Sequence, residues 1–230
     1  MIHLNNIFSV SKYESKLLMR SWFFKVFAVL SVLLIALASV GILEMNQHAF
    51  NSIPSLVAYN LMLYFNVVQA IVSIFLASEY LKRDKQLDTS EVFYVRPLSN
   101  AEYLLGKMWG TIRVFLMLNL VVMVIAITIS YIYMQENVSP LSFLLYLALL
   151  NIPTLVYIVG LSTLLMLIIK NQALTFVILL GYIGLTLFYV GDKCYYLFDY
   201  MGFNIPLVKS TITGFSDLQG ILIHRLLYFL

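Results

Sequence analysis

The side chains able to do chemistry are concentrated in one polar stretch, residues 78–110, which holds ten charged residues. Elsewhere the chain offers little chemistry. Cys194 is the only cysteine, which excludes an internal disulfide, and His3, His48 and His224 are too scattered to supply a pair of haem ligands. No GxxxxGK(S/T) sequence is present to hold ATP phosphates. The pattern predicts neither catalytic residues nor a metal site in this chain, and it indicates that the charged stretch serves binding.

A short helix is predicted in the middle of this stretch. Asp88 and Glu91 have the spacing of an N-cap and its capping box, so the helix is expected to begin at Asp88. Pro97 disfavours the helical conformation at Arg96, and the helix should therefore end there.

Helices are also predicted at the two ends of the stretch. Ser99 and Glu102 repeat the capping pattern and start a helix that continues through Lys107 into the next apolar run. Glu79 and Arg83 are four residues apart and can pair along one helix face. Alternatively, one of them bridges to the N-terminal segment or to a partner protein.

The N-terminal tail, residues 1–21, contains a third capping pattern, from Ser11 to Glu14. An amphipathic helix along the inner membrane surface fits its distribution of apolar and charged residues. Three basic residues fall on the more polar side of this helix: Lys12, Lys16 and Arg20. The alternative is a basic flank that only sets the orientation of the chain.

Five long apolar runs separate the polar segments of a chain that is 62% hydrophobic and 11% charged. Each run is near or above the ~20 residues that a helix needs to cross ~30 Å of hydrocarbon. The runs are residues 22–43, 53–77, 114–133, 141–169 and 173–190. A sixth run begins at Ile221 and is too short to cross before Leu230. The predicted fold is an all-α polytopic membrane protein, one domain with five complete spans and a truncated sixth.

The basic residues set the expected orientation. They cluster before the first run and between the second and third, whereas residues 44–52 and 134–140 contain no Lys or Arg. The positive-inside rule places the N-terminus and residues 78–110 in the cytoplasm and residues 191–220 outside, on or dipping into the membrane. The expected location is a bacterial inner membrane.

The first run has one alternative interpretation. Ala36 and Ala38 imitate the cleavage site of a signal peptide behind a basic leader. The apolar run is longer than the usual core of a signal peptide and continues to Leu43, which favours a membrane span.

A few polar or helix-breaking residues interrupt the runs. Asn60, Asn66 and Gln69 lie in the second run and predict hydrogen bonds between helices, with a substrate path as the alternative. Pro153 predicts a kink in the fourth run. Gly181 and Gly184 should let a neighbouring helix approach the fifth closely. No charge lies in the central part of any run, which argues against an ion-coupled transporter or an intramembrane protease.

Taken together, these segments resemble the type-2 ABC transporter permeases. The resemblance covers most of the chain and depends chiefly on about thirty residues around the charged stretch. The positions that carry it are Glu14, Arg20, Glu79, Arg83-Asp84, Thr89-Ser90-Glu91, Arg96-Pro97-Leu98-Ser99, Glu102 and Leu105-Gly106-Lys107.

The resemblance implies a membrane-spanning permease whose cytoplasmic stretch docks on a separate ATPase subunit, which would bind ATP and Mg²⁺. It implies a second permease copy or half, six spans per half, and export of lipid-like or peptide substrates. The residues expected to bind the ATPase are Arg83, Asp88, Glu91, Arg96, Pro97, Ser99, Glu102 and Lys107, with Glu14 and Arg20 in the interfacial helix.

The main alternative is a polytopic membrane enzyme or an assembly factor without transport activity. A stable ATPase partner would separate the two functions. The net charge of +3 is too small to indicate nucleic-acid binding.

Overall fold

The computed structural model describes residues 3–45, 54–86, 99–134, 138–190, 198–205, 207–208 and 219–227. The regular structure in these residues is entirely helical. Five helices are long and apolar enough to cross a membrane, one for each predicted span. The fold is therefore compatible with a polytopic membrane protein.

The first three spans are uninterrupted helices. They are α2 (Trp22–Met45), α4 (Pro54–Gln86) and α6 (Asn100–Met134). Both α4 and α6 are longer than the apolar runs that predicted them, because helix continues into the polar stretch from either side. The shorter helix α1 (Leu4–Arg20) precedes α2 and is separated from it by Ser21.

The fourth and fifth spans each contain a π-helical turn. The fourth consists of α7 (Pro140–Tyr146), η2 (Leu147–Asn151) and α8 (Ile152–Ile169). The fifth consists of α9 (Gln172–Leu185) and η3 (Thr186–Val190). The irregular turn of the fourth span lies directly before Pro153, where the sequence predicts a kink.

A tight turn joins α8 to α9. Lys170 adopts the left-handed conformation, with φ 58°, and its N–H donates to the carbonyl of Met166. The side chain of Asn171 then accepts hydrogen bonds from the N–H groups of Ala173 and Leu174, which caps the start of α9. The two helices therefore fold back on one another in a hairpin.

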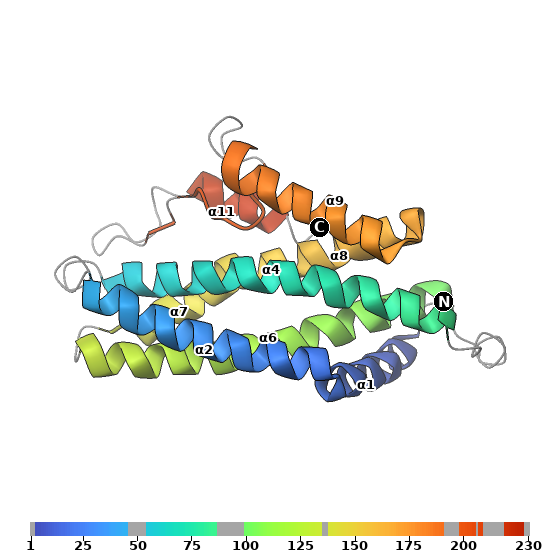
Figure 1. Ribbon diagram of the computed structural model, residues 1–230, viewed down its shortest axis with the longest axis horizontal. Helices are drawn as coiled ribbons and strands as arrows, with labels where there is room; N and C mark the ends of the chain where they lie inside the picture. The colour runs from blue at the N-terminus through green and yellow to red at the C-terminus, as the bar shows by residue number, and fades with distance from the viewer. Residues whose placement is uncertain are drawn as a thin grey trace.

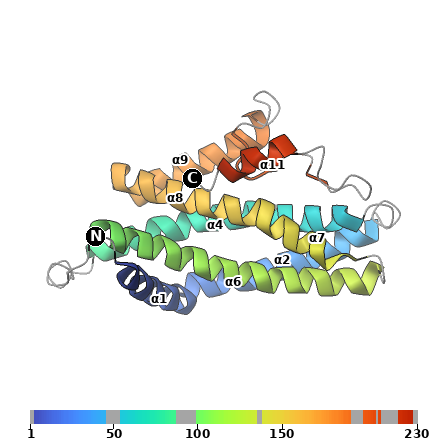
Figure 2. The ribbon, with the colours of Figure 1, turned by 180° about the vertical axis from the view of Figure 1, so that it is seen from behind.

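The helices α2, α4 and α6 run along the long axis of the molecule, while α9 and α11 (Gln219–Leu226) lie on the other side of α4 from α2 (Figures 1 and 2). Helix α1, the end of α4, the start of α6 and the turn between α8 and α9 share one end of the bundle. The predicted orientation requires this arrangement, because these segments contain most of the basic residues.

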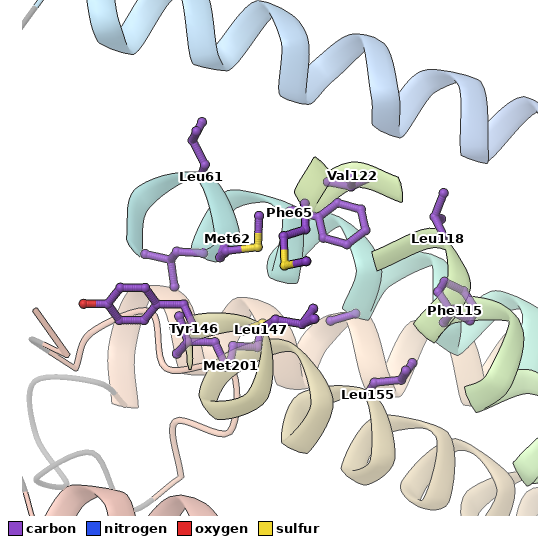
Figure 3. Packing of buried hydrophobic residues seen from close by; sticks show 14 of the residues in the cluster. Leu61, Met62, Phe65, Phe115, Leu118, Val122, Tyr146, Leu147, Leu155 and Met201 are labelled. Carbon is purple, nitrogen blue, oxygen red and sulfur yellow. The ribbon is translucent and has the colours of Figure 1, made fainter. Parts of the chain in front are cut away.

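The apolar core lies between α4, α6 and the fourth span. Phe65 of α4, Phe115 of α6 and Tyr146 of α7 are among its largest fully buried side chains. Figure 3 shows Met201, from the segment between α9 and α11, among the side chains of this core. The described part of the sixth apolar run lies in the short helix α11.

Candidate functional site

Helix α1 packs on the first turns of α6, and we call this contact the α1–α6 junction. The face of α1 that is buried there carries mostly small or polar side chains: Ser11, Glu14, Ser15 and Leu18. The predicted cap at Ser11 is wrong, because the helix already begins at Leu4. Ser11, Glu14 and Ser15 are instead buried against α6. Lys12, Lys16 and Arg20 lie on the exposed side of α1, as predicted.

A buried ion pair lies in the middle of the junction. Lys107 Nζ is 3.7 Å from Glu14 Oε2, and the two side chains are only 4% and 1% exposed. The Lys107 ammonium also lies 4.9 Å from the centre of the Tyr103 ring. Because a charge buried without its partner is costly, each of these two residues stabilises the position of the other.

Glu102 joins the start of α6 to the start of α1. Its N–H donates to Ser99 Oγ and its carboxylate accepts from the N–H of Ser99, both at 3.2 Å, so the predicted capping box is present. The same carboxylate accepts from the N–H of His3 at 2.6 Å and from Asn6 Nδ2 at 3.1 Å. One side chain thus caps α6 and holds the N-terminal end of α1 against it.

Two glycines of α6 allow the close approach of α1. A Cβ at Gly106 would lie 2.7 Å from Val10 Cβ, and one at Gly110 would lie 2.9 Å from Glu14 Cβ. Ser15 Oγ also donates to the Gly110 carbonyl at 3.1 Å. At Gly181 and Gly184 no described atom lies within 4 Å of a built Cβ, so the close approach predicted there stays a prediction.

A Gly106→Ala change is expected to weaken the α1–α6 junction by about 1 to 3 kcal/mol, because the added methyl overlaps Val10 and the carbonyl of Ile7. Labelling of a cysteine introduced at buried Ser11 should become faster, in a Cys194→Ala background. The matched control is Gly181→Ala, where the methyl meets no described atom. Equal labelling in the two variants would mean that α1 does not depend on this contact.

The structure describes little of the other predicted partner-binding residues. Arg83 lies in the last turns of α4, but its side chain is not among those described. Asp88, Glu91, Arg96 and Pro97 lie outside the described residues. The predicted short helix and the docking role of this stretch therefore stay predictions.

A second polar group lies inside the bundle, and we call it the carboxamide cluster: Asn66, Gln69, Asn119, Asn151 and Thr154, all at most 1% exposed. Asn66 Nδ2 donates to Thr154 Oγ1 at 3.0 Å, and one turn along α4 Gln69 Nε2 donates to the carbonyl of Asn151 at 3.1 Å. Asn119 Nδ2 of α6 donates to Gln69 Oε1. The cluster thus links α4, α6 and the fourth span.

The cluster is not fully paired. Asn66 Oδ1, Asn119 Oδ1 and both side-chain polar atoms of Asn151 are buried without a hydrogen-bond partner among the described residues. Buried polar atoms nearly always have such a partner, in protein or ordered water. Of the residues predicted to line a substrate path, Asn66 and Gln69 belong to the cluster, whereas Asn60 is only half-buried and makes none of these bonds.

Two charged residues reach the interior from outside the five apolar runs. Arg225 of α11 is 1% exposed, and its Nη2 donates to Thr154 Oγ1 at 3.3 Å. Asp199 is also 1% exposed and accepts hydrogen bonds from three backbone N–H groups of its own turn. The central parts of the apolar runs thus contain no charged residue, but the folded bundle buries two charged residues from other segments, Arg225 and Asp199.

The geometry defines a helical protein with five potential membrane spans, an ion-paired junction at one end and a neutral polar cluster inside. No protein-family model matches the chain, and comparison with curated proteins and with solved structures finds no match. A proposal for the function therefore depends on the physical features of the chain itself.

Proposed function

We propose that this chain is the membrane-spanning permease subunit of an ATP-driven ABC-type transporter. In this proposal it works with a second permease copy or half and with a cytoplasmic ATPase, which binds ATP and Mg²⁺. Export of lipid-like or peptide substrates fits the absence of charged residues from the central parts of the apolar runs.

The observation that carries the proposal is the α1–α6 junction. Glu102, in the second half of the charged stretch, is bonded both to Ser99 and to the start of α1, and Lys107 is buried against Glu14. The end of the stretch, α1 and the start of α6 thus form one connected unit. A force applied to the stretch by a partner would act on the whole unit rather than on a free loop.

The same helix leads from the junction to the carboxamide cluster. Helix α6 is continuous from Asn100 to Met134, so Glu102 and Asn119 lie on one rod. Asn119 is bonded to Gln69 of α4. A tilt of α6 at its first turns would therefore move Asn119 and alter its hydrogen bond to Gln69. A transporter of this class needs such a link between its ATPase partner and its transport path.

Co-purification of a Walker-motif ATPase with the full chain in mild detergent tests the proposal. We expect Glu91→Lys to abolish binding, because misplaced charges across an interface can cost several kcal/mol. Pro97→Ala should reduce stimulation of ATP hydrolysis while the protein still inserts.

The control is a change at Gln47, in the opposite predicted loop. If both variants bind and stimulate the ATPase like the control, the stretch is only a connector. If no ATPase co-purifies at all, a membrane enzyme or assembly factor becomes the better interpretation.

A further inference from the structure

Residues 200 and 201, in the described segment 198–205, lie against the middle of two spans. Asn66 Nδ2 donates to the Met201 carbonyl and Thr154 Oγ1 to the Tyr200 carbonyl, both at 2.8 Å. Asn66 and Thr154 lie near the middle of the apolar segments Ser55–Ser78 and Pro140–Ile169. Irregular backbone at this depth is tolerated only where protein or water satisfies its polar groups.

The Arg225 guanidinium bonds both to this segment and to the fourth span. Its Nη1 donates to the carbonyls of Asp199 at 3.1 Å and Tyr200 at 2.6 Å. On the other side, Nε donates to the Leu149 carbonyl at 3.1 Å, while Nη2 donates to the Leu150 carbonyl at 3.2 Å and to Thr154 Oγ1. Five bonds match the five N–H donors of an arginine, and a lysine could not form this fork.

Pro153 explains why acceptors are available there. Proline has no N–H, so Leu149, four residues earlier, lacks its α-helical donor. The π-helical turn η2 shifts the neighbouring bonds as well, since the Ile152 N–H bonds to the Leu147 carbonyl. Arg225 Nε thus gives the Leu149 carbonyl a donor that Pro153 cannot supply.

The segment that Arg225 holds has its own local structure. Asp199 accepts from the N–H groups of Gly202, Phe203 and Asn204 at 2.8 to 3.2 Å. Gly202 has φ 73°, and a Cβ there would lie 2.7 Å from Leu150 Cδ2. These bonds lie within the turn, so they survive if the turn moves away from the spans.

We infer that residues 198–205 and 207–208, together with α11, form a cover that Arg225 holds closed over the carboxamide cluster. The cover contacts the cluster directly, at Asn66 and Thr154. The cluster contains buried amide atoms that have no described partner, and water or a neutral polar ligand would complete their hydrogen bonds. Release of Arg225 uncovers the cluster. This inference does not depend on an ATPase partner.

Cysteine accessibility tests the cover. The reporter is Asn151→Cys in a Cys194→Ala background, because the Asn151 side chain makes no described hydrogen bond that the change would remove. In membranes, a small water-soluble thiol reagent should label this cysteine at least about tenfold faster after Arg225→Ala. Arg225→Lys should restore slow labelling only in part.

A second variant and a control make the result decisive. Tyr59→Phe removes the hydroxyl that donates to the Ile205 carbonyl at 2.6 Å, leaves Arg225 intact, and should speed labelling about threefold. If Arg225→Ala does not accumulate, Tyr59→Phe decides the question. The control reporter is Ala126→Cys, buried in α6. Unchanged labelling at residue 151, or an equal increase at residue 126, overturns the cover.

Discussion

Replacement of Lys107 by methionine is expected to destabilise the α1–α6 junction by roughly 3 to 5 kcal/mol, because the buried Glu14 carboxylate loses the cation beside it. The junction is almost closed to water, so solvent cannot screen or compensate the charge. Helix α1 should then leave α6, and a cysteine at Ser11 should label at least about a hundredfold faster.

The neighbouring Lys12 provides the matched control. Lys12 is exposed on α1, and Lys12→Met removes one positive charge without leaving a buried carboxylate unpaired. The double variant Glu14→Met with Lys107→Met should recover much of the loss, since apolar residues can replace a buried pair at little cost. If Lys107→Met labels as slowly as Lys12→Met, the ion pair does not hold α1 in place.

Replacement of Arg225 by methionine is expected to destabilise the protein by roughly 3 to 5 kcal/mol, because four backbone carbonyls inside the bundle lose a charged donor. The midpoint of thermal unfolding in mild detergent should fall. Arg113→Met, a change at an exposed arginine of α6, should leave it nearly unchanged.

The cost of losing Arg225 should depend on Pro153. In a Pro153→Ala background the new N–H can donate to the Leu149 carbonyl, so removing Arg225 should cost about 1 to 2 kcal/mol less. The four variants form a double-mutant cycle that measures this coupling. Additive effects of the two changes would show that Arg225 does not compensate for the proline.

The sequence alone predicts the helices well. A long run of apolar residues must place its backbone in a helix if it is to cross lipid, and local composition is enough to find such runs. The capping box of Ser99 and Glu102 is likewise a local pattern, and its two reciprocal hydrogen bonds are present.

Spacing patterns that fit more than one kind of contact predict the tertiary contacts less reliably. Ser11 and Glu14 have the spacing of a helix cap, yet they lie inside α1 and face α6. Gly181 and Gly184 are spaced for close packing, but the described close contact occurs at Gly106 and Gly110. The spacing of residues shows which side chains share a face, but not which neighbour covers that face.

Asn66 and Gln69 were predicted from the sequence to bond between helices, but the distant partners that complete the buried polar sites were decided by tertiary structure alone. The pairs formed by Glu14 with Lys107, and by Arg225 with the carbonyls around Pro153, join residues far apart in the sequence. Arg225 has no local sign of burial, because a charge in a short apolar run usually marks an exposed end. Only the folded bundle places it beside the backbone carbonyls of the fourth span and of residues 199–200, where the hydrogen bonds offset the loss of water.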